Sequence, residues 1–185
     1  MKDGRRVVVI SSIGLPPGLV AASVDLHGLV EQELEHQRVI HGKTCELSND
    51  VPPGLGLVTR EILLRRVLEN LLSNAVRASG ASGRVRVAAS TAAGRLRLSV
   101  EDSGSGFPAD ELPRLFDFFK ASPARVSSGG SGLGLGLPIT RELAFELAGS
   151  EVSAPIWAEN RPEGGARIIV ELPLQPAPEP GRFEL

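Results

Sequence analysis

The stretch Asn70–Arg77, which reads Asn-Leu-Leu-Ser-Asn-Ala-Val-Arg, lies inside a long helical pattern. Apolar residues recur in this region at spacings of three and four, and such spacing predicts a helix that buries one stripe. The stripe consists of Leu64, Val67, Leu68, Leu71, Leu72, Ala75 and Ala78. Asn70, Asn74 and Arg77 share a neighbouring ridge at the edge of the stripe, because they are four and three residues apart. These polar side chains are placed either to face a cleft or, in the simpler interpretation, to face only solvent.

Upstream of this helix, the chain predicts a second helix and a strand. Asp25 is expected to cap an amphipathic helix of about four turns. Its apolar positions are Leu26, Leu29, Val30, Leu34 and Ile40. Residues 43–48 form a predicted strand that ends at the Asn49-Asp50 pair. The long helix itself is expected to begin at Thr59 as its N-cap and to stop at Gly80.

Downstream, strands predominate. The predicted strands are residues 84–89, 95–100, 152–158 and 166–172. The first two form a β-hairpin that turns at residues 92–94. A third helix follows Gly136, carries Pro138 in its first turn and has Ile139, Leu143 and Leu147 on its apolar face. Because strands and helices do not alternate strictly, the pattern favours an α+β two-layer sandwich over a doubly wound parallel fold.

The composition is that of a globular protein with 42% hydrophobic and 23% charged residues. We divide the 185 residues into an N-terminal strand or linker remnant (1–23), one folded domain (24–174) and a flexible, proline-rich tail (175–185). A net charge of −2 without basic runs argues against nucleic acid as a partner. No apolar run reaches membrane-spanning length, and Cys45 is the only cysteine. We expect a cytoplasmic domain, either free or part of a membrane-anchored protein, with no membrane contact of its own.

Two glycine-rich segments carry the remaining chemical information. Asp102-Ser103-Gly104-Ser105-Gly106 follows a strand, so its carboxylate can accept a hydrogen bond from an exocyclic amine while its glycines admit a flat ligand. An ordinary turn is the alternative. Residues 129–136 are glycine-rich and precede a helix, an arrangement that suits a polyphosphate, although a simple hinge would have the same composition. Residues 107–131, between these segments, form a long loop of the kind that serves as a lid or is disordered.

The helix ridge complements these loops. The amide oxygen of Asn74 can bind Mg²⁺, and Asn70 can hold a metal-bound water. Arg77 can neutralise a phosphate.

Taken in order, these segments resemble the four boxes of the catalytic ATP-binding domain of sensor histidine kinases, which belongs to a wider group that includes gyrase. Residues 69–77 are similar to the N box, and residues 102–106 to the first glycine box. Residues 115–119 resemble the F box, and residues 132–137 the second glycine box. The resemblance extends from about residue 24 to residue 174. It implies a Bergerat fold, in which three helices cover one face of a mixed, mostly antiparallel sheet of about five strands.

The resemblance also implies roles for individual residues. Asp102 would bind the adenine amino group, and Gly104, Gly106 and Phe107 would shape the adenine pocket. Asn74 would coordinate Mg²⁺, assisted by Asn70 through water, and Arg77 would contact a phosphate. Further residues would surround the phosphates: Gly132, Leu133, Gly134, Leu135 and Gly136, with Lys120 or Arg125 reaching the γ-phosphate. ATP and Mg²⁺ are the implied cofactors.

Three departures from the family pattern affect these expectations. The phosphoacceptor histidine, followed by an acidic residue and a proline, is missing, because His27, His36 and His41 lack that context. The F box is one residue short, which puts the lid geometry in doubt. The segment 147–155 is longer than the usual turn.

We therefore expect the ATP-binding part of a histidine kinase, which acts on a histidine of a dimerisation and phosphoacceptor domain and, through it, on a response regulator. Such a piece would be monomeric. The alternatives are a stand-alone regulator similar to anti-sigma serine kinases and a nucleotide-binding module without phosphoryl transfer. Asn70 stands where members that hydrolyse ATP outright have a glutamate, so hydrolysis by this chain should be slow.

Overall fold

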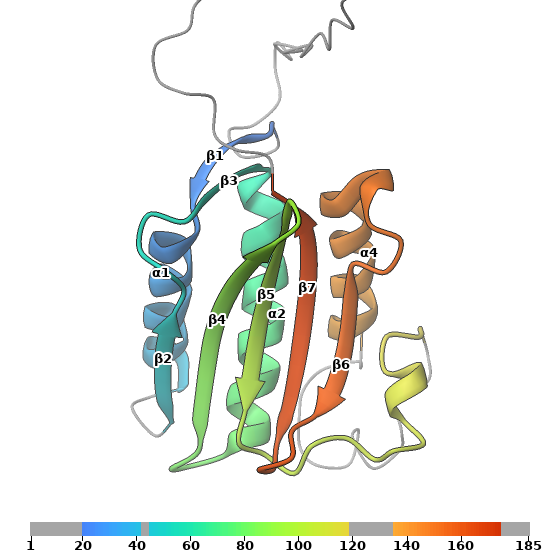
Figure 1. The fold of residues 1–185 in the computed structure, drawn as a ribbon. Coiled ribbons are helices and arrows are strands. Elements are labelled where there is room, and N and C mark those ends of the chain that lie inside the picture. Colours follow the sequence, from blue (N-terminus) through green and yellow to red (C-terminus); the bar gives the residue numbers. More distant parts are fainter. Residues whose placement is uncertain (1–19, 42–44, 119–134, 175–185) are drawn as a thin grey trace, which may run out of the picture.

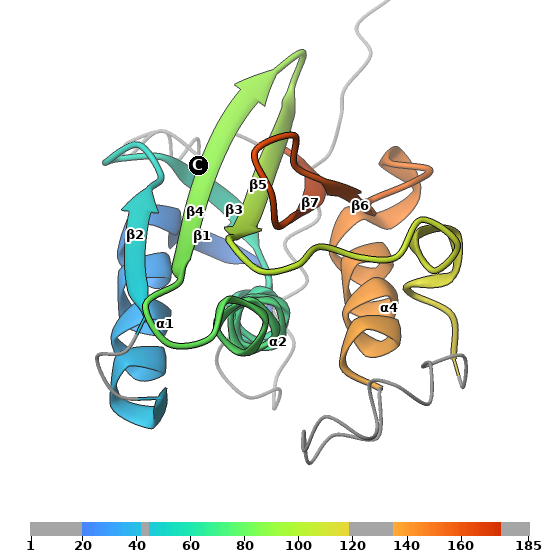
Figure 2. The same ribbon diagram turned by 90° about the horizontal axis from the view of Figure 1, so that it is seen from below.

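The computed structural model describes residues 20–41, 45–118 and 135–174, which fold into two layers (Figure 1). One layer is a β-sheet, and the other consists of three helices packed on one of its faces (Figure 2). The helices are α1 (Leu26–His41), α2 (Glu61–Ser79) and α4 (Gly136–Ala148), with short 3-10 turns at Leu112–Arg114 and Gly149–Glu151. The strands are β1 (Ala22–Asp25), β2 (Glu46–Asp50), β3 (Gly56–Thr59), β4 (Arg84–Ala92), β5 (Arg95–Asp102), β6 (Ile156–Asn160) and β7 (Ala166–Pro173).

The main sheet has five strands in the order β2-β4-β5-β7-β6. β2 pairs with β4 in parallel, and all other neighbours are antiparallel. β1 and β3 form a separate two-stranded antiparallel sheet. The predicted α+β sandwich, with a mixed sheet of five strands under three helices, is thus confirmed. None of the helices in residues 20–41, 45–118 and 135–174 combines the length and the apolar composition that a bilayer crossing requires.

α2 lies in the middle of the helical layer, between α1 and α4. Its leucines at positions 64, 68, 71 and 72 are almost fully buried, and burial of each stabilises the fold by roughly 1.5–3 kcal/mol. The predicted stripe is correct except at its end, where Ala78 is exposed and Val76 is buried in its place. Gly80 ends the helix as expected, with a positive φ of 64° and its N–H bonded to the carbonyl of Val76.

The prediction that Thr59 caps α2 is wrong. Thr59 is the last residue of β3 and pairs with Ala22 of β1, so that Arg60 becomes the N-cap residue, without a side-chain cap. This small sheet depends on pairing between distant segments, which local patterning does not reveal. β2 likewise extends through Asn49 and Asp50, which were expected to end it, because both pair with β4.

The buried side of α4 also differs from the prediction. Of the predicted apolar face, Leu143 and Leu147 are partly buried against the core, whereas Ile139 is exposed. The buried residues of α4 are Leu137, Pro138, Thr140, Ala144 and Ala148. Small residues face the core because α4 packs closely against both α2 and β7. β6 begins only at Ile156, since the long segment before it contains a 3-10 turn.

The β4–β5 hairpin fits its prediction closely. Ala92 pairs with Arg95, and the two residues between them, Ala93 and Gly94, both have positive φ angles (50° and 72°). That combination belongs to a two-residue type I′ turn, whose twist matches that of the strands. β5 then carries its inward-facing residues to Asp102, at the edge where α2 ends.

Candidate functional site

The polar ridge of α2 faces the beginning of α4. Arg77 donates a hydrogen bond from Nη2 to Oδ1 of Asn74. Gly136 is the first residue of α4, and a Cβ atom added to it would lie 3.8 Å from Nδ2 of Asn74. Asn70 lies one turn earlier on α2 and is partly buried, and its side chain forms no hydrogen bond with other residues that the structure describes. The ridge therefore has the amide of Asn70, without a side-chain hydrogen bond to the described residues, at one end, and the hydrogen-bonded pair of Asn74 and Arg77 at the other.

Asp102 is the second part of the site. Only 7% of this residue is exposed, and its Oδ1 atom accepts two backbone hydrogen bonds, from Gly104 N–H at 2.8 Å and from Ala166 N–H at 3.3 Å. Its other oxygen, Oδ2, accepts no hydrogen bond from the described parts of the chain. Burial raises the pKa of the Asp102 carboxyl, while the two backbone bonds and the Arg161 guanidinium lower it by less. The carboxylate is thus fixed by one oxygen and leaves the other available to a ligand donor.

The segment after Asp102 passes directly over the end of α2. A Cβ atom on Gly104 would come within 2.6 Å of the carbonyl oxygen of Ala78, so only glycine fits at this approach. Gly106 has a positive φ of 74°. Phe107 is partly buried against the hydrophobic core, and the chain then crosses towards α4 (Figure 2). The approach of Gly104 to Ala78 places Asp102 at the same end of the molecule as the α2 ridge.

The described F-box residues pack partly against the core and contact α4. Leu115 is buried, Phe116 is partly buried against the core, and Phe118 is 43% exposed. Asp117 lies 3.9 Å from Arg141 of α4 in an ion pair. The shortened box therefore still contacts the helix that follows the second glycine box.

Several predicted site residues lie outside the described residues: Lys120, Arg125, Gly132, Leu133 and Gly134. Leu135, the N-cap residue of α4, and Gly136 are both partly buried beside the ridge. Asn70, Asn74, Arg77, Asp102, Gly104, Gly106 and Phe107 are all described. Segments that are 25 to 65 residues apart in the sequence thus converge around the C-terminal half of α2.

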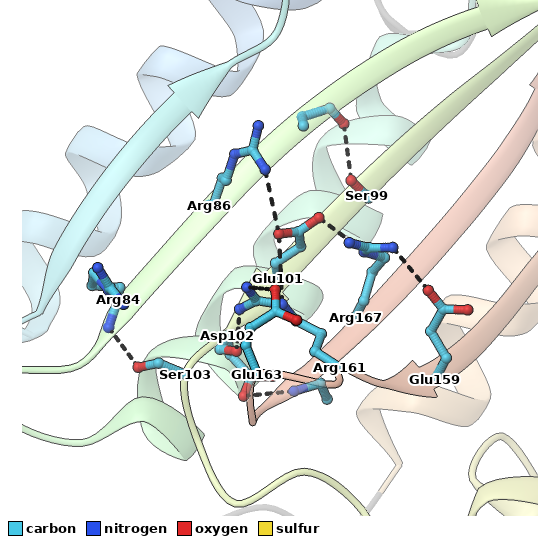
Figure 3. A network of polar contacts seen from close by, with 12 residues as sticks. Arg84, Arg86, Ser99, Glu101, Asp102, Ser103, Glu159, Arg161, Glu163 and Arg167 are labelled. Atoms are coloured by element: carbon cyan, nitrogen blue, oxygen red, sulfur yellow. Dashed lines mark hydrogen bonds and ion pairs between the residues drawn. The ribbon is translucent and has the colours of Figure 1, made fainter.

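Sequence reasoning missed the charged network behind Asp102, on the sheet face that the helices leave uncovered (Figure 3). Glu101 is only 4% exposed, and three arginines surround it: Arg167 at 2.8 Å, Arg86 at 3.6 Å and Arg161 at 3.8 Å. Arg161 also donates from Nη1 to the backbone carbonyl of Asp102 at 3.0 Å. Strand alternation indicates that Glu101 and Asp102 point to opposite faces, but it does not indicate that both are buried.

Comparison with known proteins agrees with this geometry. Residues 59–176 match the family model of histidine kinase-, DNA gyrase B- and HSP90-like ATPases. The chain is 41% identical over 113 residues to the signal transduction histidine-protein kinase AfsQ2 of Streptomyces coelicolor, and 38% identical over 138 residues to the sensor protein kinase CarS of Pseudomonas aeruginosa. These matches cover 60% and 75% of the chain, but only 19% and 28% of the two relatives.

Solved structures share the fold. Full-length ShkA, crystallised in complex with AMPPNP, superposes with a TM-score of 0.70 and 31% identity, over 89% of this chain and 33% of ShkA. The catalytic domain of the histidine kinase ThkA superposes with a TM-score of 0.70 at 24% identity, over 83% of this chain and 95% of that domain. The chain therefore belongs to the family of histidine kinase-, DNA gyrase B- and HSP90-like ATPases, and it is a catalytic ATP-binding domain of the sensor histidine kinase type.

Proposed function

We propose that this domain binds ATP together with Mg²⁺ and donates the γ-phosphoryl group to a histidine on a dimerisation and phosphoacceptor domain outside it. The observation that carries the proposal is the buried carboxylate of Asp102, held by two backbone N–H groups through Oδ1 and open at Oδ2. A carboxylate in this arrangement is oriented to accept one hydrogen bond from an exocyclic amine, such as that of adenine.

The surrounding residues fit a flat base. Gly104 and Gly106 keep the backbone beside Asp102 free of side chains, and Phe107 offers an apolar ring next to them. Because close contacts occupy the space that a Cβ atom would need at both glycines, the shape of this segment depends on their lacking side chains. We assign adenine recognition to Asp102, Gly104, Gly106 and Phe107.

The α2 ridge fits the phosphates and the metal. Asn74 offers an amide oxygen as a ligand for Mg²⁺, and Asn70 can orient a water bound to the ion. Arg77, which donates a hydrogen bond to Asn74, supplies a positive charge for the phosphates beside this metal site. Bound Mg²⁺ would neutralise the charge of the triphosphate. We assign the remaining phosphate contacts to Lys120 and to residues 132–136.

The domain's own histidines are poor phosphoacceptors. Nδ1 of His27 donates to the carbonyl oxygen of Val51 at 2.7 Å, and His36 is exposed on α1, a different helix from the one that carries the ridge. We infer that the accepting histidine belongs to another domain, which passes the phosphoryl group to a response regulator. The name of AfsQ2, a histidine-protein kinase, favours histidine over serine as the acceptor. We place the domain in the cytoplasm and expect it to be monomeric on its own.

The first test is calorimetric titration of the domain with ATP and with ADP, with and without Mg²⁺. We expect Mg²⁺-dependent binding that Asp102→Ala abolishes or weakens by at least about tenfold, since the amine loses its acceptor. The absence of any nucleotide binding would refute the proposal.

The second test measures phosphoryl transfer. The domain is mixed with γ-labelled ATP and a purified phosphoacceptor domain from a related sensor kinase, and acid-labile label on histidine is the expected result. Steady-state ATP hydrolysis should be slow, because the amide of Asn70 cannot act as a general base. Brisk hydrolysis without transfer would contradict the assignment of Asn70.

A further inference from the structure

The side chain of Asn160 forms two hydrogen bonds with the backbone of one distant residue. Its Oδ1 atom accepts from Phe107 N–H at 2.8 Å, and its Nδ2 group donates to the Phe107 carbonyl at 2.7 Å. Phe107 belongs to no strand, so this amide takes the place of a neighbouring strand and satisfies both backbone groups of the residue. One side chain therefore determines where the chain leaves the first glycine box.

Asn160 itself has a well-defined position. It is the last residue of β6 and pairs with Ala166 of β7. The N–H group of Ala166 is one of the two donors to Oδ1 of Asp102. One end of the β6–β7 hairpin thus contacts both ends of the segment from Asp102 to Phe107.

Because Gly106 has no side chain, the amide of Asn160 can approach the glycine box closely. A Cβ atom at position 106 would lie 2.7 Å from Oδ1 of Asn160 and 3.2 Å from the carbonyl oxygen of Gly165. The amide of Asn160 therefore packs against the backbone of the glycine box as well as bonding beyond it. Removing the amide would free the segment at its C-terminal end, while Asp102 would still hold it at the other end.

We propose that Asn160 is a positioning residue for nucleotide binding, which holds residues 104–107 in the conformation that receives the base. This inference rests on the proposed function. Asn160 acts through Phe107 and Gly106 and does not itself need to touch the nucleotide. Because a segment ordered in advance loses less conformational entropy on binding, the two hydrogen bonds contribute to affinity.

The test compares Asn160→Ala with Asn49→Ala. Asn49 is a matched control because its side chain also bonds two backbone groups, donating to the His27 carbonyl and accepting from Val51 N–H, each at 3.1 Å. It lies in β2, at the opposite edge of the sheet from β6. We expect N160A to weaken ADP binding about tenfold, the equivalent of one to two hydrogen bonds, and N49A to leave it unchanged.

A second readout is local. Amide hydrogen exchange measured by NMR should show that Phe107 N–H exchanges faster in N160A than in the wild type, whereas core amides of β5 keep their protection. N49A should leave the Phe107 amide protected. Faster exchange confined to this segment separates positioning from a general loss of stability.

A further variant keeps the test decisive if N160A does not fold. Asn160→Asp retains the acceptor for Phe107 N–H but places a carboxylate oxygen against the Phe107 carbonyl oxygen, so we expect a weakening at least as large as the tenfold loss in N160A. If the wild type binds ADP and both Asn160 variants bind it equally well, the inference is wrong while the proposed function stands. If the wild type binds no nucleotide, the proposed function fails, and this inference fails with it.

Discussion

Gly165 lies directly against the backbone carbonyl of Asp102, so that a Cβ atom at position 165 would clash with that oxygen. The same carbonyl accepts a hydrogen bond from Arg161 at 3.0 Å. The turn between β6 and β7 therefore packs onto the end of β5 at the residue that we assign to adenine. Any side chain at position 165 would have to displace Asp102.

We predict that Gly165→Ala destabilises the domain far more than Gly164→Ala. Both glycines have positive φ angles (84° and 100°), but no atom lies within 4 Å of a Cβ atom at position 164. The backbone strain alone should cost G164A about 1–2 kcal/mol, whereas G165A adds a steric clash and should lose about 3 kcal/mol or more. Urea unfolding of the two variants measures the difference, and equal losses would show that the turn can shift away from Asp102.

We predict that Asp102→Asn stabilises the domain at neutral pH. Burial raises the pKa of Asp102 above its ordinary value of 3.8, so the ionised carboxylate opposes folding at pH values above the folded-state pKa. This cost disappears as the pH falls below 3.8, where the carboxyl is protonated in the folded and unfolded states alike. The advantage of D102N should therefore be present at pH 7 and shrink towards pH 4.

The same variant should bind nucleotide poorly, because its amide nitrogen would face the amine of the base as a second donor. Unfolding curves of wild type and D102N at pH 7 and pH 4 test the effect on stability, and an ADP titration at pH 7 tests the effect on binding. A D102N variant that is less stable than the wild type at pH 7 would contradict the role that we give to burial.

We predict that Asn74→Ala weakens ATP binding when Mg²⁺ is present and has little effect in EDTA. The amide oxygen of Asn74 accepts a hydrogen bond from Arg77 in this structure, and it is the atom that we assign to the ion. Loss of one oxygen ligand should reduce the Mg²⁺-dependent gain in affinity by about tenfold. Titrations with and without the metal separate this effect from a general loss of phosphate contacts, and an equal loss under both conditions would contradict the assignment.

We predict that Glu101→Gln destabilises the fold more than Glu171→Gln. The Glu101 side chain is 5% exposed and lies among three arginines, Arg86, Arg161 and Arg167. Neutralising Glu101 leaves three guanidinium groups close together without the carboxylate between them. The arginines are partly exposed, so we expect a loss of about 1–3 kcal/mol rather than the full cost of a broken buried pair.

Glu171 serves as the control, because among the described residues it forms an ion pair with a single arginine, Arg97, whose side chain is 58% exposed. Its neutralisation should cost less than about 1 kcal/mol. Thermal unfolding in low and high salt distinguishes the two carboxylates, since salt screens the exposed pair more strongly. Similar losses for both variants would show that the arginine cluster does not depend on Glu101.

The sequence alone determined most of the local structure. The periodicity of α2, the stop at Gly80 and the turn at Ala93–Gly94 depend on residues that are close in the chain. The candidate ligands on α2 and in the first glycine box are likewise predicted from the sequence, because the residue types involved occur at short, recognisable spacings. The α+β class followed from the order of these elements.

The way in which distant segments meet depends on the folded chain and is not visible in local sequence. The pairing of β1 with β3 took Thr59 away from the helix cap, and close packing against α2 and β7 placed small residues on the buried side of α4. Some roles arise from contacts across 53 to 66 residues of sequence, which no periodic pattern predicts. The residues concerned are Glu101, Asn160, Arg161 and Gly165. Local sequence determines secondary-structure propensity and the spacing of residue types. The burial of a side chain and its bonding partners are determined only when the sheet places β5 beside β7.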